Sequence, residues 1–323
     1  MLEFTRNLEE SLISIQNELI WRTYRVGQYR EFFVYEPKKR LIMALPFRDR
    51  VVQWAIYRVL NPVFDRRYIA DSFACRAGYG THRAVDRLQH WLRYLDRRPG
   101  RIYVLKLDIS KYFYRVDHDT LLKILGRIIK DRDLMWLLES IIRAENTKFG
   151  LVLGDHSFQR ERVAECGMPI GNLSSQMFAN LYLNELDQHA KHVLKARHYI
   201  RYMDDVIILH PDKRRLWRLK EEISAFLQDQ LRLTLNNKTT VRSADQGVDF
   251  CGYRTWPTHR RLRKTTAKKM RRRLRFLSRA YARGEVGLET SNASVQSYVG
   301  LLMHCNSYRL RESVFGGLVL RRQ

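Results

Sequence analysis

The spacing of apolar residues divides the chain into helices and short strands. Apolar residues recur every three or four positions over residues 6–24, which predicts an amphipathic helix. The same spacing predicts helices that begin near Phe47 and over residues 82–95, 117–143, 174–186 and 213–230, with a break near Lys130-Asp131. Strand-like runs cover residues 29–35, 40–45 and 102–107. Interleaved helices and strands of this kind indicate an α+β fold.

Turn-forming residues predict where the strands fold back. Glu36-Pro37-Lys38-Lys39 joins the first two strand-like runs, and proline favours a turn there. A second hairpin is expected over residues 147–164, with Gly154-Asp155 as its turn. Residues 250–253 are expected to form a short strand with a glycine inside, which often marks the close approach of a ligand.

One predicted hairpin, residues 199–209, carries two adjacent carboxylates at its tip, Asp204 and Asp205. Tight hairpin turns prefer Asn-Gly or Asp-Gly, because these residues tolerate positive φ. Two neighbouring aspartates repel each other unless a cation neutralises them. A solvated surface turn would be the simpler interpretation of an isolated Asp-Asp pair.

A third carboxylate, Asp108, ends the apolar run of residues 102–107. Carboxylates at the ends of neighbouring strands can converge on Mg²⁺, which takes oxygen ligands and substrate phosphates. Two such ions, roughly 3.5–4 Å apart, stabilise the attacking and leaving oxygens in phosphoryl transfer. Because Phe113 follows five residues after Asp108, the combination with the Asp204-Asp205 hairpin resembles the palm of reverse transcriptases.

The charge of the chain points to a polyanionic partner. Lys and Arg outnumber Asp and Glu so strongly that the formal net charge is +25. Residues 258–284 contain no acid and many bases, yet keep a helical apolar spacing. This segment predicts a helix that lies against phosphates, with a solvated charged face as the alternative.

Other features limit where the protein works. No apolar run approaches the length of about 18 residues that a membrane span needs. The four cysteines are widely spaced, which argues against a zinc site and against a disulfide framework. We therefore expect free thiols, a reducing cytoplasmic location and no membrane partner.

Three loops add candidate ligand contacts. Arg76 lies in a glycine-punctuated loop that could approach a phosphate, and Thr81 at its end could cap the following helix. The Gly/Pro-rich loop 166–173 precedes a helix and could offer backbone donors to an anion or a base pair, although a plain helix entry explains it equally well. Lys238 occupies a turn near the presumed site, and Lys38, Lys39 and Arg40 could hold a triphosphate or be a solvated turn.

The order of these stretches, over roughly residues 24–285, resembles the fingers, palm and thumb of reverse transcriptases. Residues 29–37, 170–176 and 250–259 look like those of the diversity-generating retroelement family of bacteria and phages. Most other reverse transcriptases carry Gln-Gly-x-x-x-Ser-Pro in the Gly/Pro-rich loop. Here Ile170 stands at the Gln place and Gln176 at the Pro place, as in that family.

The resemblance implies a right-hand polymerase fold with an antiparallel palm sheet and a helical thumb. The implied divisions are an N-terminal helical segment at 1–28, fingers at 29–100, a palm at 101–255 with interleaved fingers elements at about 118–166, and a basic thumb at 256–323.

The resemblance also implies a role for individual residues. Catalysis falls to Asp108, Asp204 and Asp205, which with Ile109 would hold two Mg²⁺ ions, and to Lys238 as a proton donor to pyrophosphate. The implied substrate-binding residues are Arg40, Arg76, Phe113, Ile170, Gly171, Gln176, Tyr202 and Met203, with Phe113 against the ribose 2′-position. Gly252 and Tyr253 would grip the primer, and Lys264, Lys268, Lys269, Arg271, Arg272 and Arg273 would bind nucleic acid.

The implied function is RNA-templated DNA synthesis with frequent errors opposite adenine. Expected partners are template RNA, the cDNA/RNA duplex, deoxynucleoside triphosphates and a small, basic, oligomeric accessory protein. Two alternatives stay open: another prokaryotic reverse transcriptase of the group II intron or antiviral type, and a catalytically idle RNA-binding scaffold.

Overall fold

The computed structural model describes residues 2–35, 39–144, 146–151 and 162–321 of the chain. The first half contains α1 (Leu2–Arg6), α2 (Leu8–Ile20), β1 (Arg30–Val34), β2 (Arg40–Ala44), α3 (Phe47–Asp65), α4 (Thr81–Asp96), β3 (Tyr103–Asp108), α5 (Tyr112–Arg115), α6 (His118–Ile128) and α7 (Arg132–Arg143). The second half contains α8 (Leu173–Gln188), a π-helical turn (His189–Val193), β4 (His198–Tyr202), β5 (Asp205–His210), α9 (Lys213–Leu231), β6 (Thr240–Ser243), a 3₁₀ turn (Ala244–Gln246), β7 (Val248–Phe250), β8 (Tyr253–Thr255), β9 (Arg260–Leu262), α10 (Lys264–Ala282), α11 (Leu288–Met303) and α12 (Tyr308–Phe315).

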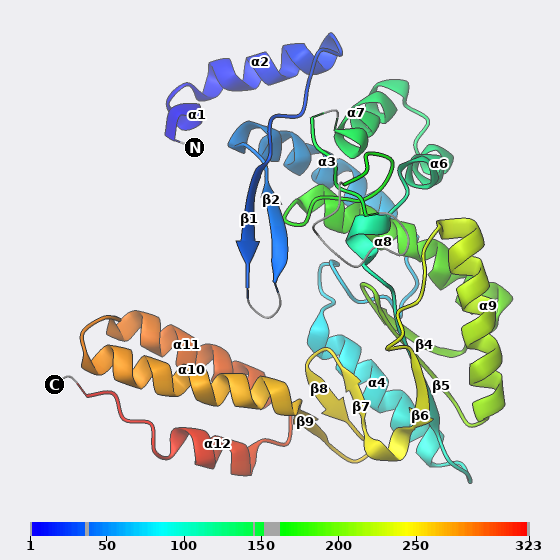
Figure 1. Ribbon diagram of the computed structural model, residues 1–323, viewed down its shortest axis with the longest axis vertical. Helices are drawn as coiled ribbons and strands as arrows, with labels where there is room; N and C mark the ends of the chain where they lie inside the picture. Colours follow the sequence, from blue (N-terminus) through cyan, green and yellow to red (C-terminus); the bar gives the residue numbers. More distant parts are fainter. Residues whose placement is uncertain (1, 36–38, 145, 152–161, 322–323) are drawn as a thin grey trace.

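The centre of the molecule is an antiparallel sheet with strand order β4-β5-β3-β6 (Figure 1). Successive residues of a strand point to opposite faces, so β3 contributes to two cores. Leu105 and Leu107 pack in one core with residues of α8 and α9, whereas Val104 packs in the other with residues of α4. The sheet therefore lies between α8 and α9 on one face and α4 on the other.

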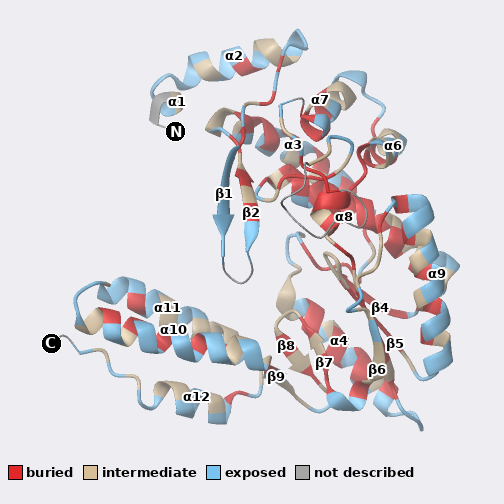
Figure 2. Cartoon of the chain, viewed as in Figure 1, coloured by how far each residue is buried: buried red, intermediate tan, exposed pale blue. Residues whose placement is uncertain are grey.

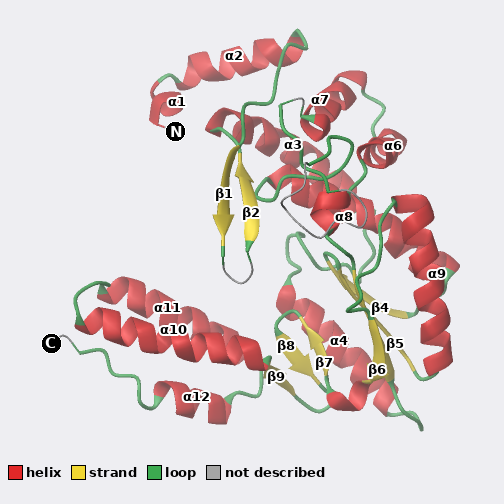
Figure 3. Cartoon of the chain, in the orientation of Figure 1, coloured by secondary structure: helices red, strands yellow, loops and turns green. Residues whose placement is uncertain are grey.

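The helices around the β1–β2 hairpin form a separate layer above the sheet (Figure 3).

The predicted break in residues 117–143 is confirmed: α6 and α7 each begin after an aspartate whose carboxylate accepts a backbone N–H. Asp117 accepts from Thr120 at 2.9 Å, and Asp131 accepts from Leu134 at 2.7 Å. Such caps satisfy donors that a helix start leaves unpaired.

Helix α8 is buried along almost its whole length (Figure 2). The N-terminal helix differs. The expected apolar face of residues 6–24 does not form a core contact along its length, because Leu8 and Leu12 remain exposed and Ile15 is the buried residue of α2.

Two local predictions are wrong. Thr81 does not cap α4; Gly80 occupies the cap position at φ 122°, and no side chain hydrogen-bonds there. Residues 250–253 are not a continuous strand, because β7 ends at Phe250 and Cys251-Gly252 form the turn to β8, both with positive φ. Positive φ at both central residues is the pattern of a tight type I′ hairpin.

Two predicted turns, Glu36–Lys38 and Gly154-Asp155, lie outside the described residues. At the base of the second one, Gly150 and Val163 pair across an antiparallel bridge. The described helices include none that is long and apolar enough to cross a membrane.

The C-terminal helices form an arm that extends from the β7–β8–β9 sheet (Figure 1). Strand β9 follows the expected palm boundary at residue 255 but pairs with β8, so this small sheet spans that boundary. Likewise α4, within the region assigned to the fingers, contacts β4 and β8 of the palm layer.

Candidate active-site cleft

A cleft of about 680 Å³ opens between the hairpin layer and the edge of the central sheet, where β3 and β5 meet. It brings together many of the predicted site residues: Arg40, Asp108, Ile109, Phe113, Ile170, Gly171, Gln176, Tyr202, Met203, Asp204, Asp205 and Lys238. Arg76, Gly252, Tyr253 and the basic residues of α10 are not part of its lining.

The three aspartates meet because of the strand register. Asp108 is the last residue of β3 and stands opposite Asp205, the first residue of β5. Tyr202 also pairs with Asp205, so Met203 and Asp204 form the turn between β4 and β5. Met203 adopts a left-handed φ of 53°, which is uncommon for a non-glycine residue. The predicted hairpin and its partner strand are thus present, with the carboxylates at one sheet edge.

Asp205 has a cationic partner that sequence reasoning missed. The ammonium nitrogen of Lys106 lies 3.0 Å from the Asp205 carboxylate and donates to the Asp249 carbonyl at 2.9 Å. Burial raises the pKa of Asp205, with Asp204 and Asp108 adding to the rise and Lys106 opposing it. The signal was present in the sequence, because Lys106 lies two residues before Asp108 and therefore on the same strand face.

The donor set suits Mg²⁺ that is shared with a substrate. Mg²⁺ is usually bound by one or two carboxylates together with water and substrate phosphates. Asp108 and Asp204 face the cleft, and Ile109 offers a backbone carbonyl beside them. Among the residues that the structure describes, no group of three or more His, Cys, Asp or Glu side chains is arranged to hold a metal ion by itself. With Asp205 paired to Lys106, this set needs phosphate oxygens to complete it.

The Gly/Pro-rich loop is fastened to the hairpin above the cleft. The Ile170 carbonyl accepts the Met43 N–H at 3.0 Å, and the Asn172 side chain donates to the Tyr29 hydroxyl at 3.2 Å. Gly171 has φ +123°, and a Cβ there would lie 3.1 Å from Ile42. A side chain at Gly171 would therefore be both strained and crowded.

The rim of the cleft is cationic and its wall is aromatic. Arg40 is exposed at the start of β2, and Lys238 is exposed in the turn before β6. Phe113 is partly buried and packs edge-on against Tyr112, with ring centroids 5.6 Å apart. Gln176 accepts a weak hydrogen bond from the Cys75 thiol at 3.6 Å. A polyanion entering the cleft would meet positive charge at its edge and aromatic surface inside.

Arg76 is engaged elsewhere. Its guanidinium, only 5% exposed, pairs with Asp65 at 2.6 Å and donates to the Ile69 and Ser72 carbonyls at 2.9 Å. It also stacks 3.9 Å from the Tyr79 ring centroid. The expected contact with a triphosphate is not what the structure shows, because every face of this side chain is occupied by protein.

The two residues predicted to grip the primer, Tyr253 and Gly252, differ in their surroundings. Tyr253 is buried, and its hydroxyl donates to the Leu301 carbonyl at 3.0 Å and lies 3.1 Å from His82 Nε2. Its side chain therefore connects β8 to α4 and α11 and is not presented to a ligand. Gly252 lies in the half-buried β7–β8 turn, and its carbonyl accepts the Arg263 N–H at 3.0 Å.

The predicted basic residues of α10 are exposed, but they do not share one face. Successive residues of a helix are about 100° apart, so Arg271, Arg272 and Arg273 point in different directions. Arg271 donates to the Ser313 hydroxyl of α12 at 3.0 Å. Lys268 and Arg279 lie opposite the buried Met270 and Leu274. The triplet is thus not a single phosphate-binding face.

Comparison with known proteins places this geometry in a family. Protein YkfC of Escherichia coli (strain K12) is 30% identical over 275 residues, which cover 74% of this chain and 70% of that protein. The group II intron-encoded protein LtrA of Lactococcus lactis is 22% identical over 314 residues; these span 76% of this chain but 49% of LtrA, about half its length.

Solved structures agree on the fold. Telomerase from Candida tropicalis in complex with a fragment of telomeric RNA superposes with a TM-score of 0.56 at 13% identity, over 94% of this chain and 57% of that one. Apo telomerase from the same organism gives 0.57 at 12% identity, over 91% of this chain and 59% of that one. The chain has the right-hand polymerase fold that these structures share. A family model described as reverse transcriptase (RNA-dependent DNA polymerase) matches residues 36–255, and the protein belongs to that family.

Proposed function

We propose that this cleft carries out RNA-templated DNA synthesis. The observation that carries the proposal is the strand register, which sets Asp108 opposite Asp205 with Asp204 at the adjoining turn. In this reaction the primer 3′-hydroxyl attacks the α-phosphorus of a deoxynucleoside triphosphate. A new P–O bond forms as the bond from the α-phosphorus to the bridging oxygen breaks, pyrophosphate leaves, and the hydroxyl proton passes to water.

The chain's own residues would divide the work. Asp108, Asp204 and the Ile109 carbonyl would hold Mg²⁺, which supplies charge stabilisation at the attacking and leaving oxygens. Lys238 at the rim would donate a proton to pyrophosphate. Phe113 on the cleft wall would exclude a ribose 2′-hydroxyl by contact. The net charge of +25 and the exposed bases of α10 suit template RNA and the cDNA/RNA duplex.

Substitution of Asp204 tests the reaction. Asp204→Asn keeps the size of the side chain but removes its charge, so nucleotide addition should fall below detection while RNA binding persists. Primer extension and filter binding on one preparation measure both. The matched control is Asp229→Asn, on the exposed face of α9. Retained synthesis by Asp204→Asn, or loss in the control as well, would contradict the assignment.

The finer proposal is error-prone synthesis of the diversity-generating type, with a basic accessory protein as partner, in a bacterial cytoplasm. It is supported by Ile170 and Gln176, both at the cleft. Ile170 has no side-chain donor or acceptor and few rotamers, so a mispaired nucleotide forfeits little relative to a correct one. Loss of one hydrogen bond corresponds to about 0.5–1.5 kcal/mol, which limits the effect on fidelity to about two- to twelve-fold.

Exchange of Ile170 tests this finer proposal. Ile170→Gln should lower misincorporation opposite template adenine by that modest factor and leave correct insertion less affected. Sequencing cDNA made by both proteins on one adenine-rich template gives the error spectra. Equal spectra would place the error-promoting feature in the RNA or in another protein.

The relatives favour a second candidate function, that of an intron-type reverse transcriptase. LtrA is an intron-encoded protein, and nuclear intron maturase 1 of Arabidopsis thaliana is 28% identical over 97 residues, 30% of this chain and 13% of that protein. An intron-type enzyme would make errors without preference for adenine. A pair of near-identical repeats beside the gene would favour the diversity-generating function.

A further inference from the structure

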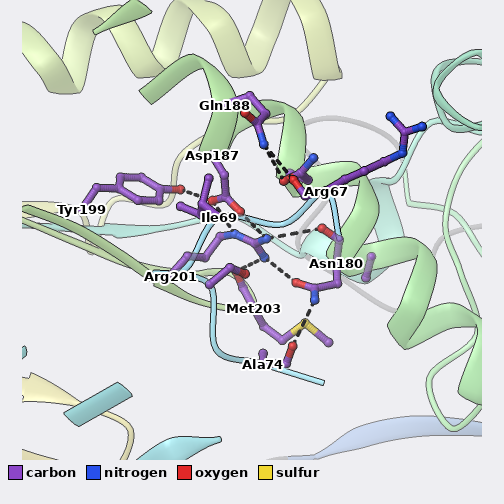
Figure 4. Close-up of polar contacts among 12 residues, drawn as sticks. Arg67, Ile69, Ala74, Asn180, Asp187, Gln188, Tyr199, Arg201 and Met203 are labelled. Atoms are coloured by element: carbon purple, nitrogen blue, oxygen red, sulfur yellow. Dashed lines mark hydrogen bonds and ion pairs between the residues drawn. The ribbon is translucent and has the colours of Figure 1, made fainter. Parts of the chain in front are cut away.

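A fully buried ion pair lies next to Met203, in the turn between β4 and β5 (Figure 4). Arg201 of β4 and Asp187 of α8 are both 0% exposed. The Asp187 carboxylate accepts from Arg201 Nε at 2.7 Å and from Arg201 Nη2 at 2.6 Å. The Tyr199 hydroxyl donates to the same carboxylate at 2.7 Å. The pair is bidentate, the strongest geometry available to arginine and a carboxylate.

The other nitrogen of the guanidinium reaches the turn itself. Arg201 Nη1 donates to the Met203 carbonyl at 3.3 Å and to the Asn180 side-chain oxygen at 3.0 Å. Met203 is the residue with φ 53°, and its carbonyl belongs to the peptide that leads into Asp204. A left-handed φ at such a residue persists only when the surroundings enforce it. The guanidinium supplies that enforcement from inside the protein.

The same group ties a second wall of the cleft to the turn. Asn180 donates to the Ala74 carbonyl at 3.0 Å, and the Arg201 backbone N–H donates to the Asp71 carbonyl at 3.0 Å. Phe73 N–H in turn donates to the Arg201 carbonyl at 3.0 Å. Ala74 lines the cleft. One arginine therefore connects α8, the segment before α4 and the catalytic hairpin.

Stability alone does not account for this arrangement. Burying two charges is costly, and well-packed apolar residues in place of a buried pair are often as stable or more so. What apolar residues cannot do is donate hydrogen bonds to Met203 and Asn180. We propose that Arg201 is a positioning residue that fixes the Met203 peptide, and with it the carboxylate of Asp204, relative to Asp108. The inference rests on the proposed function for its catalytic consequence, not for its structural one.

The first experiment changes the reach of the side chain but not its charge. Arg201→Lys keeps a cation opposite Asp187, yet a single ammonium cannot serve Asp187, Asn180 and Met203 together. Residues that orient a reacting group through a second contact commonly contribute about 10–100-fold. We expect kcat to fall by such a factor, with KM for nucleotide and template affinity unchanged. Hydrogen exchange of the backbone amides in residues 202–205 should be faster than in the unmodified protein.

The second experiment separates packing from positioning. The double variant Arg201→Met/Asp187→Leu replaces the pair by apolar residues of similar size. Its melting temperature should lie above that of the single variant Arg201→Met, which leaves the buried Asp187 carboxylate unpaired, while kcat and the exchange of residues 202–205 should match those of Arg201→Lys. Tyr199→Phe is the control, because it removes one hydrogen bond to Asp187 and does not touch the turn. It should lower the melting temperature slightly and leave kcat unchanged.

Clear outcomes would overturn the proposal. Unchanged kcat and unchanged exchange at 202–205 in Arg201→Lys would reduce Arg201 to a core residue. A kcat restored by the apolar double variant would show that packing suffices. If the unmodified protein makes no DNA, the proposed function fails, whereas the exchange measurement still decides whether Arg201 holds the turn.

Discussion

Arginine is used in opposite ways beside the central sheet and on α10. Arg201 of β4 and Arg76 of the segment before α4 have buried side chains, and each is bound to a carboxylate and to backbone carbonyls. The bases of α10 stand on the exposed side of a helix whose buried residues include Met270 and Leu274. These two buried arginines hold protein segments together, while Lys268 and Arg279 are exposed on one face of α10.

These two uses of arginine differ in what the guanidinium contacts, not in the residue type. A guanidinium can satisfy five N–H donors within the protein or offer them to phosphates. A buried one must be satisfied internally, because an uncompensated charge in the core is expensive. The arginines of a sequence therefore indicate that the protein attracts a polyanion. They do not show which side chains contact that polyanion.

The largest expected effect follows removal of a buried arginine. Arg76→Ala leaves Asp65 and two carbonyls without their donor, so the free energy of unfolding should fall by about 1–3 kcal/mol. Chemical denaturation measures this, and KM for nucleotide should not change in the folded protein. Arg97→Ala, at the exposed end of α4, is the control. A raised KM at full stability would give Arg76 back its expected contact with the triphosphate.

The next effect is on the salt dependence of RNA binding. Each phosphate contact removed lowers the slope of log affinity against log salt by about 0.7–0.9. Lys268→Ala/Arg279→Ala, on one face of α10, should therefore flatten the slope by about 1.4–1.8. Arg271→Ala should leave it unchanged, because Arg271 contacts Ser313. Equal slopes for all three proteins would remove α10 from the RNA interface.

The smallest effect concerns Arg40, which is exposed like the bases of α10 but lies on the rim of the candidate cleft. An exposed ion pair contributes about 0.2–1 kcal/mol, so Arg40→Ala should raise KM for nucleotide by about 1.4- to 5-fold at unchanged melting temperature. Steady-state extension measures it. Arg30→Ala, at the far end of the same hairpin, is the control. A matching rise in both variants would indicate a general charge effect.

The sequence predicts best what is decided by nearby residues. The starts of α6 and α7 follow from Asp117 and Asp131, which each accept a backbone N–H from three residues ahead. The hairpin at Asp204 follows from two apolar runs around a polar centre, and its pairing with β3 from the match of strand patterns. These features depend on contacts within a few positions or on period-two alternation.

The sequence predicts poorly what is decided by distant partners. Arg76 meets Asp65 across a loop, and Tyr253 meets Leu301 from another helix, so neither partner is implied by local pattern. The role of Arg201 is likewise not implied by local pattern, because its partner Asp187 lies on α8. Leu8 and Leu12 show the converse, since helical spacing predicts a face but not whether anything covers it.

Tyr253 of β8 contacts Leu301 of α11 and His82 of α4, and this joint has a mechanical consequence. Helix α10 begins beside this joint and contains 19 residues, so at 1.5 Å per residue it is a rigid lever of about 28 Å. A duplex advances by about 3.4 Å per nucleotide along each strand. If α10 rotated by roughly 7° about its first residues, its far end would therefore move by one nucleotide step, because the helix is about 28 Å long. The contacts of the Tyr253 hydroxyl with Leu301 and His82 lie near the base of this lever.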